Sequence, residues 1–243
     1  MLFRSSLRDY PLAFPDIGIA RLDFRDQASF SLLNYKAGDW GNHRFLFEAM
    51  AARLHAGEVL WDVGANVGLV SLHFSQPFFA LKKIHAFEPS AGPRKALEAL
   101  LGSQARVSIH PFGLSSSRRQ GRMKSRQGDS SYGMVVQSHD PQGRESIRLE
   151  SGDTLVASGM EPPHLIKVDV EGHEPEVFAG LKETIRTYKP IIFFEHIFLS
   201  DAQLRELTPQ GYCLSFLHED GSWSLDIKTR RRGHEALAEP TGI

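Results

Sequence analysis

The chain has 243 residues, of which 41% are hydrophobic and 23% charged, which is ordinary for a globular protein. This length suits one α/β domain with extensions. The formal net charge of −1 gives no overall electrostatic reason to expect nucleic acid or an anionic membrane as a partner. The single cysteine, Cys213, excludes an intrachain disulfide and a cysteine-based zinc cluster.

Residues 1–57 form an N-terminal extension that is a candidate for facing the substrate. The sequence of 1–14 shows no signal peptide, and no window reaches roughly 18 uncharged apolar residues, so we expect no membrane span and a cytoplasmic protein. Within the extension, 28–35 suits a short strand. Residues 42–57 suit a helix with Asn42 as its cap and Gly57 as its stop.

From residue 58 onward, apolar strands alternate with helical patterns. Strands are expected at 58–64, 83–89, 106–111, 164–170 and 189–196, and a final strand pair at 212–218 and 223–228. This alternation predicts an α/β fold: a Rossmann-like, doubly wound, mostly parallel sheet with an antiparallel terminal strand. Residues 58–228 form the predicted domain, and 229–243 a flexible C-terminal tail. In such sheets, ligands bind beyond the carboxyl ends of the strands.

Residues 114–152 interrupt this alternation with a basic insertion. Its nine positions 118–126 contain five cations: Arg118, Arg119, Arg122, Lys124 and Arg126. A connection of this length and composition favours a solvated mobile loop, although it can also bind an anionic acceptor. Residues 128–133, GDSSYG, are a candidate lid over the substrate.

The first chemical motif is WDVGANVG, residues 61–68. Asp62 ends a buried strand, and Gly64 and Gly68 bracket a turn into a helix. Glycines at such a turn let a ligand approach the backbone, and the helix offers free N–H groups. The spacing is not Gly-x-Gly-x-x-Gly, which argues against a dinucleotide. Asp62 suits a ligand that carries an amine better than a pyrophosphate.

The second motif is AFEPS, residues 86–90, at the end of the next strand. A carboxylate in this place, here Glu88, can accept hydrogen bonds from both hydroxyls of a ribose. Alone it is a weak signal, but together with the first motif it indicates a nucleoside site.

The third motif is LIKVDVEGHEPEVFAGL, residues 165–181. After an apolar strand it places four polar side chains in six positions: Asp169, Glu171, His173 and Glu174. Crowded carboxylates are costly unless they are neutralised, and Lys167 lies on the same strand face as Asp169. His173 is the candidate general base, because an imidazole titrates near neutral pH. Alternatively, His173 faces solvent and the glutamates begin a helix.

Polar residues near these strand ends are also candidate metal ligands. Those that can converge are His164, His173, His196, Asp169 and Glu195. No ligand motif of recognisable spacing is present, so we expect no catalytic metal.

These motifs together resemble the FkbM-type S-adenosylmethionine-dependent methyltransferases. The residues that carry the resemblance are LWDVGANVGLVSLHF, HAFEPS, GDTL and the third motif, and the match covers roughly 58–200. The resemblance implies a class I methyltransferase fold, the cofactor S-adenosyl-L-methionine and its product S-adenosyl-L-homocysteine. It also implies methylation of a hydroxyl on a sugar, a glycan or another secondary metabolite, and an anionic acceptor is one option.

Carried over by position, the resemblance also implies roles for single residues. The cofactor-binding set is Asp62, Gly64, Asn66, Gly68, Glu88, Phe112, Gly113 and Asp169, with Glu88 at the ribose and Phe112 or Gly113 near the adenine. The catalytic candidates are His173, Asp169 and Glu171.

Two other classes of function stay open from the sequence. One is a nicotinamide-dependent oxidoreductase, which the missing glycine fingerprint disfavours. The other is a non-catalytic nucleoside- or RNA-binding module. The near-neutral charge opposes RNA, and an affinity that falls steeply with salt would favour it.

Overall fold

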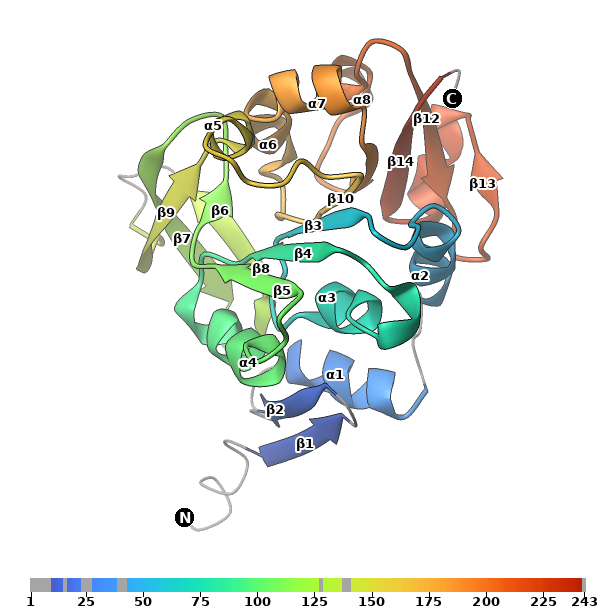
Figure 1. The fold of residues 1–243 in the computed structure, drawn as a ribbon. Coiled ribbons are helices and arrows are strands. Elements are labelled where there is room, and N and C mark those ends of the chain that lie inside the picture. The colour runs from blue at the N-terminus through green and yellow to red at the C-terminus, as the bar shows by residue number, and fades with distance from the viewer. Residues whose placement is uncertain are drawn as a thin grey trace.

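A central mixed sheet organises the chain, with helices on both faces (Figure 1). The computed structural model describes residues 10–14, 17–22, 28–38, 43–126, 129–136 and 141–241. Within these residues the sheet has eight strands in the order β13-β12-β14-β11-β10-β3-β4-β5. Two smaller sheets, β1-β2 and β6-β9-β7-β8, flank it.

Five parallel strands form the core of the central sheet and confirm the alternation read from the sequence. They are β3 (Val59–Val63), β4 (Lys83–Phe87), β5 (Val107–His110), β10 (Leu165–Val168) and β11 (Ile191–Glu195). Every residue of β3 and β10 is buried, because helices cover both faces of a parallel sheet. The functional side chains therefore have to emerge at the strand ends.

The antiparallel end of the sheet is larger than the sequence suggested. It consists of β12 (Tyr212–Leu217), β13 (Trp223–Ser224) and β14 (Glu235–Pro240). The prediction of a flexible tail over 229–243 is wrong, because β14 lies between β11 and β12 and pairs antiparallel with both. Ala236, Leu237 and Ala238 are fully buried there. The preceding run of three arginines, which suggested a solvated tail, ends a 3₁₀ helix, Ile227–Arg232.

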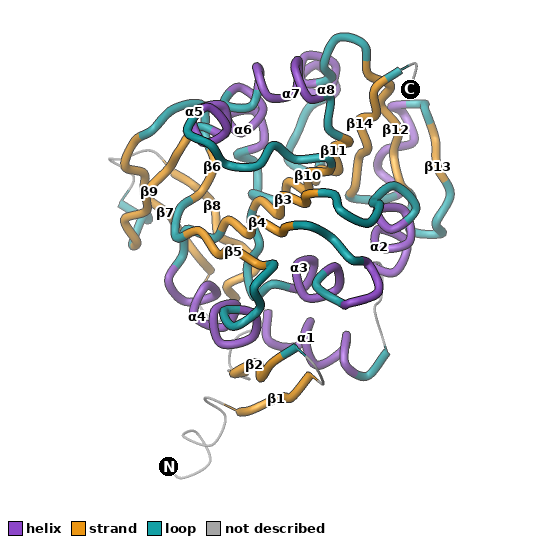
Figure 2. Tube along the Cα trace, viewed as in Figure 1, coloured by secondary structure: helices purple, strands orange, loops and turns teal. Residues whose placement is uncertain are grey.

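Helices form a layer on each face of the central sheet (Figures 1 and 2). One layer contains α1 (Ala28–Lys36), α2 (His43–Ala51), α3 (Leu69–Phe74) and α4 (Ala91–Leu101). The other contains α5 (Gly152–Ala157), α6 (Glu174–Ala179), α7 (Lys182–Tyr188) and α8 (Asp201–Leu207). Each layer buries its own hydrophobic cluster against the sheet. No helix in the described part of the chain is long and apolar enough to cross a membrane.

The N-terminal extension differs from the prediction in two respects. Residues 28–35 form α1 rather than a strand. The helix expected after Asn42 is present as α2, but it ends at Ala51 and not at Gly57, which lies in a turn; Asn42 itself lies outside the described residues. In α1, Ser29 and Leu32 are buried at a spacing of three, which is a helical period. A hairpin of β1 (Tyr10–Phe14) and β2 (Gly18–Leu22) precedes it.

The basic insertion is a sheet and not a mobile loop over its described residues. It contains β6 (Gly113–Leu114), β7 (Arg119–Arg126), β8 (Asp129–Val136) and β9 (Glu145–Glu150). Ile147 and Leu149 of β9 are buried, and Gly121 of β7 leaves room for the Leu149 side chain. The charges of the insertion hid this period-two burial pattern in the sequence.

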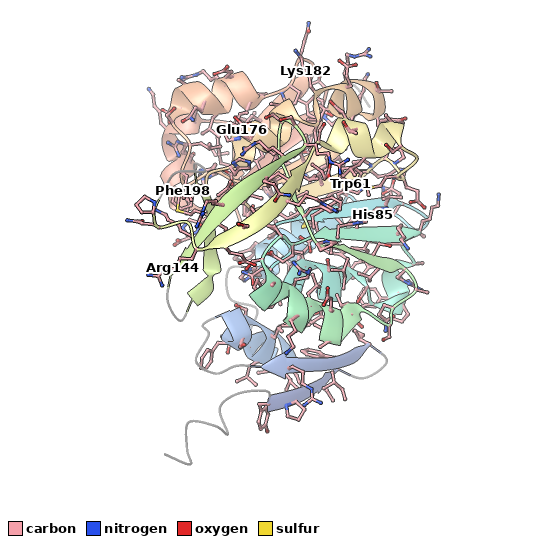
Figure 3. The ribbon with its side chains drawn as sticks, turned by 90° about the vertical axis from the view of Figure 1, so that its left-hand side faces the viewer. Trp61, His85, Arg144, Glu176, Lys182 and Phe198 are labelled. Carbon is pink, nitrogen blue, oxygen red and sulfur yellow. The ribbon has the colours of Figure 1, made fainter. Side chains whose placement is uncertain are left out.

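The segment before β10 packs on the sheet face opposite α3 and α4. Trp61 is fully buried and donates its indole N–H to the Glu161 carbonyl at 3.0 Å. The His85 imidazole lies edge-on to it, with ring centroids 6.1 Å apart, and both side chains are labelled in Figure 3. His85 Nε2 also lies 3.2 Å from a Glu161 carboxylate oxygen. These contacts anchor the start of the strand that carries the third motif.

Candidate active site

The carboxyl ends of the central strands bring the polar residues of the motifs together. In the sheet register Asp62 of β3 is the partner of Lys167 of β10, and Glu195 of β11 is the partner of Glu235 of β14. Partners in register point to the same face of a sheet. Asp169 follows β10 directly, so four carboxylates and one ammonium group converge at one edge.

The turn after β3 is built around Gly64. Its φ of 84° is in the left-handed region, and a Cβ on it would lie 1.8 Å from the Asp169 carbonyl oxygen. The N–H groups of Gly64 and Ala65 both donate to the Phe87 carbonyl at 3.0 Å. The turn is thereby tied to the ends of both neighbouring strands, and it needs glycine for conformation and for space.

Gly64→Ala is expected to lower the free energy of unfolding by well over about 1 kcal/mol, because it adds a backbone clash to an unfavourable φ. Gly57→Ala is the matched control, since Gly57 has a φ of 86° and a Cβ added to it would meet nothing within 4 Å. Urea denaturation of both variants measures the difference. Equal losses of unfolding free energy in the two variants would show that the backbone near Asp169 moves away from the added Cβ at little energetic cost.

Glu88 is held rigidly beside this turn. Its Oε1 accepts the Ser90 N–H at 2.8 Å and its Oε2 accepts the Asn66 N–H at 2.9 Å. The side chain is 4% exposed, and burial raises its pKa to about 7 despite these two hydrogen bonds. Each carboxylate oxygen keeps a further lone pair for a ligand hydroxyl.

Two cavities meet at the strand ends. The first, which we call the Glu88 pocket, is narrow at about 50 Å³ and is lined by Glu88, Pro89, Gly113, Met123 and Val135, among others. The second, the acidic chamber, measures about 270 Å³ and extends over β10, β11 and β14. The two share Gly64, Asn66, Asp169 and Glu171. They are adjoining parts of one site with Asp169 at the junction.

Lys167 is the cation of the acidic chamber. The residue is 2% exposed, and its Nζ lies 3.1 Å from Glu235 Oε1 and 3.4 Å from Asp169 Oδ2. Burial lowers the pKa of Lys167, but the surrounding carboxylates, led by Asp169 and Glu235, raise it by more, so it lies above its ordinary value. Lys167 therefore stays charged, as its predicted role in neutralising Asp169 requires.

Glu195 and Glu235 are directly opposite each other on adjacent strands. Burial and the nearby charge of Asp169 raise the pKa of Glu195, and burial also raises the pKa of Glu235. Like charges this close are not both ionised without cost. At neutral pH the pair therefore shares protons, and it can both donate and accept hydrogen bonds in the chamber.

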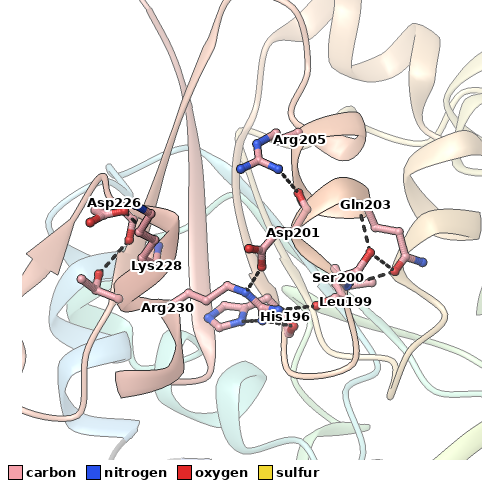
Figure 4. A network of polar contacts seen from close by, with 10 residues as sticks. His196, Leu199, Ser200, Asp201, Gln203, Arg205, Asp226, Lys228 and Arg230 are labelled. Carbon is pink, nitrogen blue, oxygen red and sulfur yellow. Dashed lines mark hydrogen bonds and ion pairs between the residues drawn. The ribbon is translucent and has the colours of Figure 1, made fainter.

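The segment after Glu195 is fixed by the Arg230 network shown in Figure 4. Arg230 donates to Asp201 Oδ1 and to the Leu199 carbonyl, both at 2.8 Å. His196 is 1% exposed, lies 3.5 Å from Arg230 through Nδ1, and packs edge-on against Phe216. Glu195 thus enters the chamber, while His196 belongs to the scaffold.

Glu174 fixes the turn that presents Asp169 and Glu171. Its Oε1 accepts the N–H groups of Val170 and Gly172 at 3.2 and 3.3 Å, and the residue is 1% exposed. Glu171 and Gly172 are both left-handed, with φ of 53° and 94°. Glu174 also begins α6, so it stabilises the helix start and the strained turn together.

His173 lies on the Glu88 side of the site and not in the acidic chamber. Its Nε2 lies 3.1 Å from Ser115 Oγ. Burial and the charge of Arg119 lower its pKa to about 4, so it is neutral at physiological pH. It has the protonation state of a base, but it lines the Glu88 pocket only and not the chamber that contains Lys167.

Most of the predicted site residues line one of the two cavities. These are Asp62, Gly64, Asn66, Glu88, Gly113, Asp169, Glu171 and His173. Gly68 and Phe112 line neither. Gly68 is the N-cap of α3 and faces Leu97, and Phe112 is buried in the core under the Arg148 guanidinium, 4.6 Å from its ring centroid. Both pack against neighbouring side chains, and their expected roles at the cofactor stay predictions.

Glu235 is the chamber residue that sequence reasoning missed, because it lay in the supposed tail. The short apolar run Ala236–Ala238 after Gly233 was the available signal for a strand. The extension contributes Ser31, His43 and Leu46 to the chamber lining, and its expected position near the substrate stays a prediction.

The basic run 118–126 does not contribute its described cations to either cavity. Their partners are Glu150 for Arg118, Ser115 for Arg119, the Gly143 carbonyl for Arg122 and Gln142 for Lys124. The side chain of Arg126 is outside the described part. The insertion supplies backbone and apolar lining through Met123, Gly133 and Val135 instead.

Three carboxylates come close enough to share a cation. Ligand atoms of Asp169, Glu171 and Glu195 lie within 4.8 Å of one another. The three candidate imidazoles are directed elsewhere. His164 does not converge with the carboxylates, because it lies at the amino ends of β3 and β10, where it accepts the Val59 N–H. His173 and His196 have the contacts given above. Lys167 already supplies a positive charge beside Asp169. The expectation of no catalytic metal stays a prediction.

The strand order, the parallel core and the antiparallel β14 define a class I methyltransferase fold. A solved structure of a methyltransferase FkbM from Methylobacillus flagellatus KT agrees, with a TM-score of 0.53 and 16% identity over 90% of this chain and 62% of that chain. Residues 62–218 match the Methyltransferase FkbM domain. The chain belongs to this family.

Two curated relatives are similar over part of the chain. Hexuronic acid methyltransferase AglP of Haloferax volcanii is 32% identical over 148 residues, which cover 57% of this chain and 56% of AglP. AMB antimetabolite synthetase AmbE of Pseudomonas aeruginosa is 27% identical over 163 residues, which cover 51% of this chain and 8% of AmbE. The chain thus matches about half of the first relative and a small part of the second.

Proposed function

We propose that the protein is an S-adenosylmethionine-dependent methyltransferase that methylates a hydroxyl on a sugar, a glycan or another secondary metabolite. The observation that carries the proposal is the position of Glu88, which two backbone N–H groups fix beside the Gly64 turn in a chain of the FkbM family. The name of AglP supports a sugar-related acceptor. The cytoplasmic location stays a prediction.

The residues present fit this cofactor. Glu88 can accept the ribose hydroxyls, and Gly113, which the resemblance assigns to the adenine, lines the same Glu88 pocket. Asp62 accepts both Ser71 hydrogen bonds at Oδ2, at 2.6 and 3.1 Å, which leaves Oδ1 for the ammonium of the methionine part. When bound, the cofactor supplies an electrophilic methyl group on a sulfonium.

The Glu88 pocket has to widen to admit a nucleoside, because ligand sites of this kind usually exceed about 300 Å³. Its outer wall comes from β7 and β8 through Met123, Gly133 and Val135. Outward movement of this hairpin is the simplest opening. The lid expected at 128–133 therefore becomes part of the proposal, as a hinged hairpin and not a loose loop, although residue 128 itself lies outside the described part.

The acidic chamber provides groups that can take the acceptor's proton. Asp169 and Glu171 line both cavities, so they lie where an acceptor in the chamber would meet the donor in the Glu88 pocket. Holding acceptor and donor in line at this junction is the main expected contribution to rate. Glu195 lines the chamber only, and its raised pKa favours its protonated form at neutral pH, so it suits a hydrogen-bond donor to the acceptor better than a base.

His173→Ala is expected to change turnover by less than about tenfold at saturating acceptor, which is below the effect of losing a general base. The reason is its place beside Ser115, away from the chamber. Steady-state kinetics of this variant against Asp169→Asn makes the comparison. A loss of about 100-fold in His173→Ala would restore the imidazole as the base.

Titration calorimetry with S-adenosylhomocysteine, and with NAD as the control, tests the proposed function. Binding of the first ligand alone is the expected result. Binding of NAD alone would favour the oxidoreductase. Binding of neither, together with RNA affinity that falls steeply with salt, would favour the nucleic-acid module.

A further inference from the structure

The described lining of the acidic chamber has more acids than cations. Its described lining contains five carboxylic acids, Asp62, Asp169, Glu171, Glu195 and Glu235, and one buried ammonium, that of Lys167. His43 adds a titratable imidazole at the chamber's α2 side. With one carboxylate assigned to the cofactor's ammonium, the chamber still has more acids than cations.

Two oxygens in this chamber are buried and accept no hydrogen bond from the described residues: Oε2 of Glu195 and Oε2 of Glu235. Buried polar atoms in proteins nearly always have partners, because an unpaired one costs free energy. Burial is the main cause of the raised pKa of both glutamates, and the negative charge of Asp169 adds to this destabilisation of their ionised forms. A bound group with several N–H donors would relieve it.

The nearby cations do not supply this charge. The described cations of the run 118–126 line neither cavity: Arg118 pairs with Glu150, and the others contact neutral groups of the insertion. Arg230 is committed to Asp201 and Leu199, and Arg53 to Glu239 at 2.6 Å. A carboxylate or phosphate on the acceptor would therefore meet like charge, with Lys167, already paired with Asp169 and Glu235, as the one ammonium in the described lining.

We propose that the acidic chamber selects an acceptor that carries a protonated amine near the hydroxyl to be methylated, such as an amino sugar or amino alcohol, and disfavours carboxylate- or phosphate-bearing acceptors. This inference rests on the proposed function. It replaces the anionic acceptor that the sequence left open. It also separates this chain from a hexuronic acid acceptor such as the name of AglP indicates.

Glu235 is the residue that distinguishes this proposal from the family's shared motifs. It lies outside residues 62–218, the part that matches the FkbM domain. Together with Glu195 it forms the wall of the chamber farthest along the sheet from β3. Its Oε1 holds Lys167 at 3.1 Å, and its Oε2 is the open acceptor, so one side chain both fixes the cation and offers a site for an amine.

Three methyl glycosides that differ in charge test the inference: those of glucosamine, glucose and glucuronic acid. Their affinities are measured by ligand-observed NMR titration, with and without saturating S-adenosylhomocysteine. The amine is expected to bind at least about tenfold more tightly than the uronate, with the neutral sugar between them. Equal affinities, tighter binding of the uronate, or no binding of the amine would each overturn the inference.

Glu235→Gln is expected to reduce the preference for the amine over the uronate, whereas Glu206→Gln, an exposed position on α8, leaves it unchanged. An unchanged preference in Glu235→Gln would contradict the role of this side chain. The order of affinities in the unmodified protein decides the proposal even if the variant folds poorly. Binding of S-adenosylhomocysteine, measured on the same sample, decides the proposed function separately.

Discussion

Glu88→Ala is expected to weaken S-adenosylhomocysteine binding by about 100-fold or more. Two hydrogen bonds to a charged group are each worth about 1.5–3 kcal/mol, and the buried pocket keeps water from replacing them. The Asn66 and Ser90 N–H groups that now hold the carboxylate would also lose their partner. Calorimetry of the variant against the unmodified protein gives the ratio directly.

The pH dependence of binding adds a second readout for Glu88. Its pKa in the folded protein is raised to about 7, mainly by burial, so it contributes stability that is present below about 4.5 and lost as pH rises towards 7. The ionised form accepts both ribose hydroxyls, and affinity should therefore rise between about pH 6 and 8. Glu88→Gln should flatten this rise. Glu206→Ala serves as the control for both measurements, and a matching loss there would point to general destabilisation.

Most of this site was predictable because it lies at the ends of apolar strands. Asp62, Glu88 and Asp169 each follow a run of buried residues, and parallel strands bring their carboxyl ends to one edge. The order of motifs along the chain then sufficed to place these carboxylates near one another. Local pattern and tertiary position agree for these residues.

The rest depended on contacts that a local pattern does not contain. Glu235 reaches the chamber only because β14 lies between β11 and β12, and this position is determined by pairing with strands distant in the sequence. The strand β7 was not recognised because it has many charged and few apolar positions. The helix α1 was not recognised because so short a segment shows too few turns to distinguish a helical from a strand pattern. The packing of Gly68 against Leu97 and of Phe112 under Arg148 likewise depends on neighbours in space that the motifs do not specify.

Lys167→Met is expected to destabilise the fold by about 3–5 kcal/mol at pH 8, because it leaves the buried carboxylates of Glu235 and Asp169 without their cation. Methionine fills much of the same volume, so the loss reports charge rather than a cavity. Lys182→Met, at the exposed start of α7, is the matched control and should change stability by less than about 0.5 kcal/mol. Urea denaturation measures both.

The pH dependence of this penalty separates charge from packing. Glu195 and Glu235 have raised pKa values in the fold, chiefly through burial, and removing Lys167 raises them further. Groups shifted upward contribute stability that is present below about 4.5 and lost as pH rises through the folded pKa. The penalty of Lys167→Met should therefore shrink at pH 5, and adding Glu235→Gln should recover part of it at pH 8. A penalty that is the same at both pH values would mean that the buried lysine stabilises the site by packing, and the acidic chamber would then need no cation to balance it.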